Sequence, residues 1–145
     1  MSSKSDMATA YFNCGFNCAQ SVLSVFCEKY GMDRNIALRV CSGLGSGFRS
    51  GEICGAVSGA ALVIGLKYGW ENAESRVAKD YCNQKIVEFM NLFRAENKSV
   101  VCRDILGFDV SVKEEYEHAR EQNLFKTTCV NMVVNAVILL EELEY

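Results

Sequence analysis

The sequence lacks proline altogether and contains one histidine among its 145 residues. Average usage would place roughly seven prolines in a chain of this length. Their absence favours helix, because proline interrupts helices. Long hydrophobic runs are missing as well: the most apolar uncharged run, 53–66, is shorter than the ~18 residues of a membrane-spanning helix. We therefore expect no membrane insertion.

The chain also lacks an excess of basic residues, because its net charge is −3. A strongly basic surface is the usual mark of nucleic-acid binding, so no nucleic-acid partner is expected. Hydrophobic residues make up 50% and charged residues 23%, which excludes a disordered chain. The length fits one domain, 1–145. The first residues lack the apolar segment of a secretory signal, which predicts a cytoplasmic protein.

Apolar residues recur with the helical period, and no segment alternates with the period of a strand. The main helices are predicted near 18–30, 53–68, 71–96 and 128–144, with short ones at about 4–13, 34–42 and 99–106 and another after Ser111. Asn17 and Asp33 are placed as N-caps, Gly31 closes a helix, and Ser111 with Glu114 forms a capping box. The sequence predicts an all-α, single-domain helical bundle of four to five main helices plus short helices.

Two helices are apolar over most of their surface. The helix near 53–68 should therefore lie centrally in the bundle. Its Gly55 and Gly59, one turn apart, would let another backbone approach closely. The apolar surface of the last helix indicates a homodimer interface.

Eight cysteines are present, and a chain without an export signal is expected to keep them in a reducing cytosol. Metal binding or redox chemistry is then favoured over stable structural disulfides. Cys27, Cys41 and Cys82 fall on apolar helix faces or near a helix end, which predicts buried small hydrophobic residues. Cys14 precedes the second helix and either joins a site or fills space.

The remaining four cysteines share a position in the first turn of a predicted helix: Cys18, Cys54, Cys102 and Cys129. Free N–H groups and the helix dipole stabilise negative charge there and lower the pKa of a thiol. Arg49, Arg103 and Lys126 are near three of them in sequence and could add to this effect. No C-x-x-C is present, which excludes a zinc knuckle or a thioredoxin motif. Convergence of the four therefore requires tertiary folding.

Four thiolates cannot all stay ionised side by side, because like charges raise each other's pKa. The preferred interpretation is thiol–disulfide exchange with a redox partner protein or a small thiol. Cys54 is the preferred nucleophile, because its glycine neighbours should leave room for approach. One alternative is electron transfer or a structural role through an iron–sulfur cluster or zinc held by the same four thiolates. Another is a non-enzymatic helical interaction domain. The disulfide pairing stays open, since four cysteines allow three connectivities.

Two other signals are weaker. The run Gly43-x-Gly45-x-Gly47 does not have the spacing of a nucleotide-binding loop, and its glycines are expected to let the backbone pass close to the Cys54 site. His118 lies in a charged segment and is expected on the surface, which argues against a Cys–His nucleophile pair.

Four segments, in order, carry a further signal: Phe16-Asn17-Cys18-Ala19-Gln20-Ser21-Val22, Cys54-Gly55-Ala56-Val57-Ser58-Gly59, Cys102-Arg103-Asp104-Ile105-Leu106-Gly107 and the late Cys129. They resemble the C-GCAxxG-C-C family of redox-active proteins over nearly the whole chain. The chain departs from the family's name at one point: the name gives the order Gly-Cys-Ala, whereas this chain has Cys54-Gly55-Ala56. The resemblance implies a redox function and assigns the family's characteristic cysteines to the same four positions.

Overall fold

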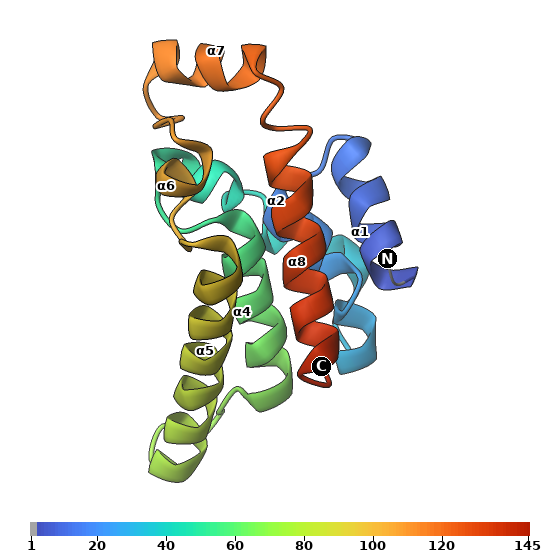
Figure 1. Cartoon of the computed structure of the whole chain (residues 1–145). Helices are drawn as coiled ribbons and strands as arrows, with labels where there is room; N and C mark the ends of the chain where they lie inside the picture. Colours follow the sequence, from blue (N-terminus) through green and yellow to red (C-terminus); the bar gives the residue numbers. More distant parts are fainter. Residues whose placement is uncertain (1–2) are drawn as a thin grey trace.

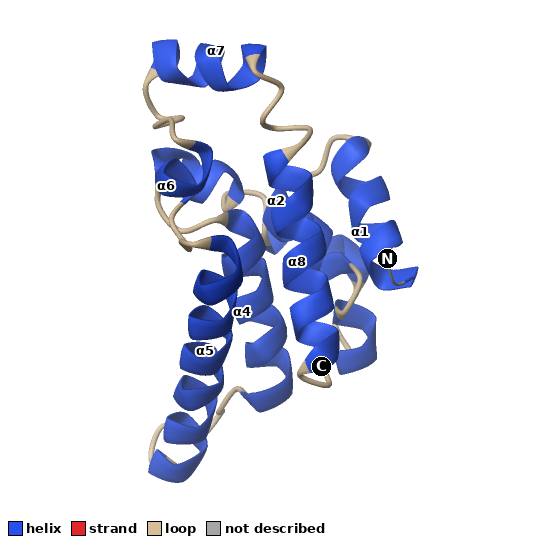
Figure 2. Ribbon diagram, in the orientation of Figure 1, coloured by secondary structure: helices blue, strands red, loops and turns tan. Residues whose placement is uncertain are grey.

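Helices form the regular structure of residues 3–145, which the computed structural model describes (Figures 1 and 2). The longer ones are α1 (Ser3–Asn13), α4 (Gly55–Tyr68), α5 (Arg76–Asn97) and α8 (Thr128–Glu142). The shorter ones are α2 (Cys18–Ser24), η1 (Cys27–Tyr30), α3 (Arg34–Val40), η2 (Gly47–Gly51), α6 (Cys102–Leu106) and α7 (Lys113–Glu121). Within these residues, β structure is limited to an isolated antiparallel bridge between Ile53 and Val101. The predicted all-α class is confirmed.

Three of the predicted helix boundaries are set by the expected capping residues. Asn17 forms a reciprocal capping box with Gln20, in which each side chain accepts the other's backbone N–H at 2.8 Å. Asp33 accepts the Ile36 N–H at 3.2 Å and begins α3. Gly31 ends η1 with a φ of 82°, a left-handed conformation that glycine adopts without steric cost.

Other predicted boundaries are wrong for a local reason. The Ser111 N–H and hydroxyl both donate to Asp109 Oδ1, so Ser111 closes a turn and does not cap α7, which begins two residues later. The helix expected from 71 begins at Arg76. The Asn72 side chain accepts the Glu74 N–H at 2.9 Å, and this turn competes with helix until Ser75 supplies a cap.

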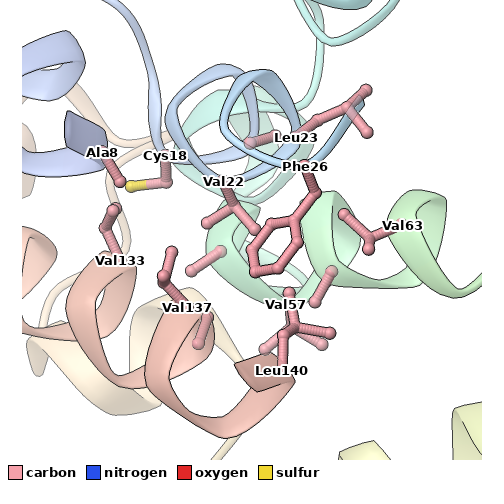
Figure 3. Close-up of a cluster of buried hydrophobic side chains, with 14 of the residues drawn as sticks. Ala8, Cys18, Val22, Leu23, Phe26, Val57, Val63, Val133, Val137 and Leu140 are labelled. Carbon is pink, nitrogen blue, oxygen red and sulfur yellow. The ribbon is translucent and has the colours of Figure 1, made fainter. Parts of the chain in front are cut away.

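The predicted helix 18–30 is two elements. It ends as α2 at Ser24 and resumes as η1 after a break at Val25 and Phe26. Phe26, within the break, is fully buried in the core, where it lies among Val22, Val57 and Leu140 (Figure 3). Burying such a side chain stabilises the fold by roughly 1.5–3 kcal/mol.

The core lies where α2 packs against α4 and α8 (Figure 3). On α4, a Cβ at Gly59 would lie 2.9 Å from the Ala19 Cα and carbonyl oxygen. The expected close helix approach is therefore found, and α2 is the helix that approaches. α1 covers α2 and α8, while α5 covers α4 and α8.

The apolar surface of α8 is covered within the chain, by α1, α2, α4 and α5. Its buried side chains are Met132, Val133, Ala136, Val137, Leu139 and Leu140. The homodimer stays a prediction, but intramolecular packing now accounts for the apolar surface on which it was based. In the part of the chain that the structure describes, none of the helices has the length and hydropathy needed to cross a membrane.

One end of the bundle carries its own small apolar cluster. α4 and α8 run in the same direction and begin at the end where α6 and α7 lie (Figure 1). Cys102, Leu106 and Val110 are buried there, with Tyr116, Leu124, Phe125 and Cys129 packed around them. The segment that carries α6 and α7 thus covers the beginning of α8.

Candidate functional site

The four cysteines selected from the sequence all lie at helix starts. Cys18 is the first residue of α2 and Cys102 the first residue of α6. Cys54 is the N-cap of α4, and Cys129 is the second residue of α8. All eight cysteines of the chain are free thiols in the structure.

Cys18 lies beside Cys54 because α4 carries glycine where α2 crosses it. A Cβ at Gly55 would stand 3.0 Å from the Cys18 Cβ and 3.3 Å from the Ala19 nitrogen. Any side chain at Gly55 would push the start of α2 away. The small residues of α4 therefore bring the two helix starts together.

Cys54 and Cys102 are brought together by the isolated β-bridge. Ile53 pairs with Val101, the Cys54 N–H donates to the Val100 carbonyl at 2.8 Å, and the Cys102 N–H donates to the Glu52 carbonyl at 2.5 Å. Each cysteine directly follows a bridged residue, so the two are diagonal neighbours across the pair. Such neighbours are typically about 7–8 Å apart, beyond the usual Cα separation of a disulfide.

The glycine-rich segment wraps around the Cys102 side of this group. Gly47 has a φ of 61°, and a Cβ there would lie 2.9 Å from the Cys102 Cβ and 2.5 Å from the Glu52 nitrogen. Phe48 and Arg49 continue the left-handed turn with φ values of 60° and 58°. Glycine at position 47 is thus required by close approach, as expected, although the neighbour is Cys102.

Cys129 completes the group, because its thiol interacts with that of Cys18 and shifts its pKa. The Cys18 sulfur points toward Ala8 of α1 and Val133 of α8, and Val133 lies one turn beyond Cys129 (Figure 3). Cys129 is half-buried, whereas the other three cysteines are buried. It is therefore the member of the group that solvent reaches most easily.

The pKa values of this hydrogen-bonded pair shift in opposite directions. The hydrogen bond that the Cys18 thiol donates lowers the pKa of Cys129, because it stabilises the Cys129 thiolate. The same bond raises the pKa of Cys18, and burial and the neighbouring thiols Cys54, Cys129 and Cys102 raise it further. Of the two thiols, Cys129 therefore gives up its proton more readily, and Cys18 keeps its proton as the donor.

Burial dominates at the other two thiols. It raises the pKa of Cys54 to about 11, although the N–H groups of Ala56 and Val57 act in the opposite direction. It raises the pKa of Cys102 to about 12, and the opposing effect of Arg103 is smaller. The Arg103 guanidinium pairs with Glu52 at 2.9 Å, which neutralises much of its charge.

The expectation that all four helix starts would lower thiol pKa values is thus wrong for Cys18, Cys54 and Cys102. α2 and α6 are short, and a buried thiolate loses more hydration energy than a few N–H groups return. The space that favoured Cys54 as nucleophile is occupied by Cys18 and the α2 backbone. Cys54 as nucleophile stays a prediction, without that support.

The three cysteines expected in the core and His118 lie where the sequence placed them, whereas Arg49 and Lys126 are not among the causes of the pKa shifts at Cys54 and Cys129. Cys27 and Cys41 have no exposed surface and Cys82 is 5% exposed, so these three are buried as predicted. Cys14 is exposed. The His118 side chain is 62% exposed and lies on the surface.

Sequence reasoning missed two features that shape the site. The first is the bridge between Ile53 and Val101. A β-branched residue directly before each of two cysteines was the sequence pattern that could have predicted it. The cover formed by Leu124 and Phe125 is the other. Its signal was an apolar pair between two helices, where a loop would normally be polar.

A metal centre at the four cysteines was the main alternative. Among residues 3–145, no group of three or more His, Cys, Asp or Glu side chains is arranged to hold a metal ion. The four thiols as they are arranged here therefore do not form the four-ligand set that zinc or an iron–sulfur cluster needs.

Comparison with known proteins identifies the family of the chain. No curated protein and no solved structure matches it. Residues 16–143 match the family described as "Putative redox-active protein (C_GCAxxG_C_C)". This match includes all four cysteines that the fold gathers at one end of the bundle. The chain belongs to the C_GCAxxG_C_C family of redox-active proteins.

Proposed function

We propose that this helical domain exchanges electrons with disulfides through Cys129 and Cys18. The observation that carries the proposal is the pairing of Cys18 with the half-buried Cys129, in which the interaction between the two thiols lowers the pKa of Cys129 and raises that of Cys18. A nucleophilic cysteine must be both ionised and reachable. Cys129 combines a lowered pKa with the greatest exposure of the four, and a second thiol stands beside it.

The exchange proceeds in two balanced steps. The Cys129 thiolate attacks one sulfur of a partner disulfide, a mixed disulfide forms, and the other partner sulfur leaves as a thiolate that takes a proton from solvent. Cys18 then gives its proton to solvent and attacks the Cys129 sulfur as a thiolate. The Cys18–Cys129 disulfide forms, the mixed disulfide breaks, and the second partner sulfur leaves as a thiolate that takes a proton from solvent. The partner gains two electrons, the protein loses two, and the reverse steps reduce the protein.

Burial gives Cys54 and Cys102 a different role. With pKa values of about 11 and about 12, both stay protonated at neutral pH. They add no charge beside the Cys129 thiolate, so the mutual repulsion of four thiolates does not arise. Their thiols are buried and neutral in the neighbourhood of the reactive pair.

A trapping experiment tests these roles. All variants carry Cys14→Ser, because the exposed Cys14 thiol would react by itself. With a small aromatic disulfide reagent, Cys18→Ser should accumulate a stable mixed disulfide, because the resolving thiol is absent. Cys129→Ser should form none, and Cys54→Ser should turn over like the parent.

Peptide mapping by mass spectrometry locates the trapped adduct. The proposal expects it on Cys129. An adduct on Cys54 would instead support the sequence-based nucleophile, and would refute the assignment of Cys129.

A further inference from the structure

We infer that Asn17 is a positioning residue for the Cys18 thiol, a role that rests on the proposed function. Asn17 directly precedes Cys18 and caps α2. Its side chain also reaches a segment that is distant in the sequence. The amide nitrogen donates to the Cys41 carbonyl at 3.1 Å and to the Ser42 carbonyl at 3.2 Å. One side chain therefore ties the start of α2 to the end of α3.

The side-chain oxygen and the backbone N–H of Asn17 also form hydrogen bonds. Its Oδ1 accepts the Gln20 N–H at 2.8 Å, and its backbone N–H donates to Gln20 Oε1 at 2.8 Å. Gln20 extends the tie, because its Nε2 donates to the Leu38 carbonyl at 2.8 Å. Aspartate could cap α2 equally well, but its carboxylate would face two carbonyl oxygens. Capping alone therefore does not explain an amide at this position.

Packing fixes Asn17 from the other side. A Cβ at Gly45 would lie 2.8 Å from the Asn17 Cβ and 3.1 Å from its Cγ. The loop after α3 therefore packs against Asn17 at Gly45, where the loop has no side chain. Asn17 is held between its own helix, the end of α3 and this loop, and Cys18 is the next residue.

This placement matters for the redox pair. The stability of a disulfide depends on how well the reduced protein already holds the two sulfurs together. Cys18 reaches Cys129 from the first turn of a short helix, so any freedom at the start of α2 moves the thiol directly. A merely structural residue would stabilise the reduced and the oxidised fold equally, and its loss would leave their ratio unchanged.

The test measures that ratio. Purified protein is equilibrated with mixtures of reduced and oxidised dithiothreitol, quenched in acid, and alkylated, and mass spectrometry gives the fraction with a Cys18–Cys129 disulfide. Asn17→Asp, which turns a carboxylate toward two carbonyl oxygens, and Asn17→Ala, which also removes the cap, should each lower the equilibrium constant for this disulfide roughly fivefold or more, about the size of one lost helix cap. Asp33→Ala is the matched control, since it removes the cap of α3 away from the thiols. It should stay within about twofold of the parent.

A further variant guards against loss of folding. Gly45→Ala keeps Asn17 but adds a methyl group against it, and should lower the same constant. If all Asn17 and Gly45 variants that fold match the parent, while the parent forms the Cys18–Cys129 disulfide, the positioning role is refuted and the proposed function stands. If the parent itself forms no such disulfide, the proposed function fails and the positioning role fails with it.

Discussion

Replacing Gly59 with alanine should destabilise the protein, although alanine is the better helix former. The added Cβ would meet the Ala19 Cα and carbonyl oxygen at 2.9 Å. Both are backbone atoms of α2, so neither can rotate away, and the two helices must separate. Overpacking of this kind costs about 1–3 kcal/mol. The gain in helix propensity returns about 1 kcal/mol.

Gly65→Ala is the matched control in the same helix, because a Cβ at Gly65 would meet nothing within 4 Å beyond the backbone of its own helix. It should raise the free energy of unfolding by about 1 kcal/mol. Since both variants gain the same propensity, the difference between them isolates the steric cost, about 1–3 kcal/mol. Urea unfolding followed by circular dichroism measures both. If Gly59→Ala is as stable as Gly65→Ala, the close contact between α2 and α4 is refuted.

Three further outcomes are expected. The free energy of unfolding should fall as pH rises from 9 toward 11, because Cys54 and Cys102 ionise near 9.0 in the unfolded chain, whereas in the folded protein they keep their protons until about 11 and about 12. Each thiol contributes at most about 1.4 kcal/mol per pH unit. A free energy of unfolding that does not change over this range would contradict the effect of burial on the two pKa values. Cys27→Ser should cost about 1–3 kcal/mol in urea unfolding by placing a hydroxyl in the core, with the exposed Cys14→Ser as the control. Tyr145→Phe should leave thermal stability unchanged or slightly higher, because the buried Tyr145 hydroxyl has no hydrogen-bond partner among the described residues. A loss of stability above about 1 kcal/mol would mean that the hydroxyl does have a hydrogen-bond partner.

The helices were predictable where one local signal dominates. Asn17, Asp33 and Gly31 act at helix ends as expected, because caps and left-handed glycines depend on a few adjacent residues. Prediction failed where two local signals compete. Ser111 carried a capping pattern, but Asp109, two residues earlier, takes both of its donors.

The positions of the four cysteines were predictable, whereas their electrostatics were not, and their role as the functional site stays a prediction. Helix-start placement selected Cys18, Cys54, Cys102 and Cys129, and the fold gathers these residues at one end of the bundle. The burial of these cysteines depends on how α2 crosses α4 and on how the segment before α8 packs over the beginning of α8. Neither arrangement is encoded in the neighbours of any one cysteine, so the rise in pKa at three of the four thiols and its fall at Cys129 could not be read from the sequence.

The most direct test of the redox pair is the disulfide map of the native chain after mild oxidation. Reduced protein is treated with one equivalent of oxidised glutathione, the free thiols are blocked in acid, and the peptides are sequenced by mass spectrometry. The account predicts one dominant intramolecular disulfide, between Cys18 and Cys129, with Cys54 and Cys102 recovered as blocked thiols. A dominant Cys54–Cys102 disulfide, or a protein in which Cys18 and Cys129 remain reduced, would contradict it.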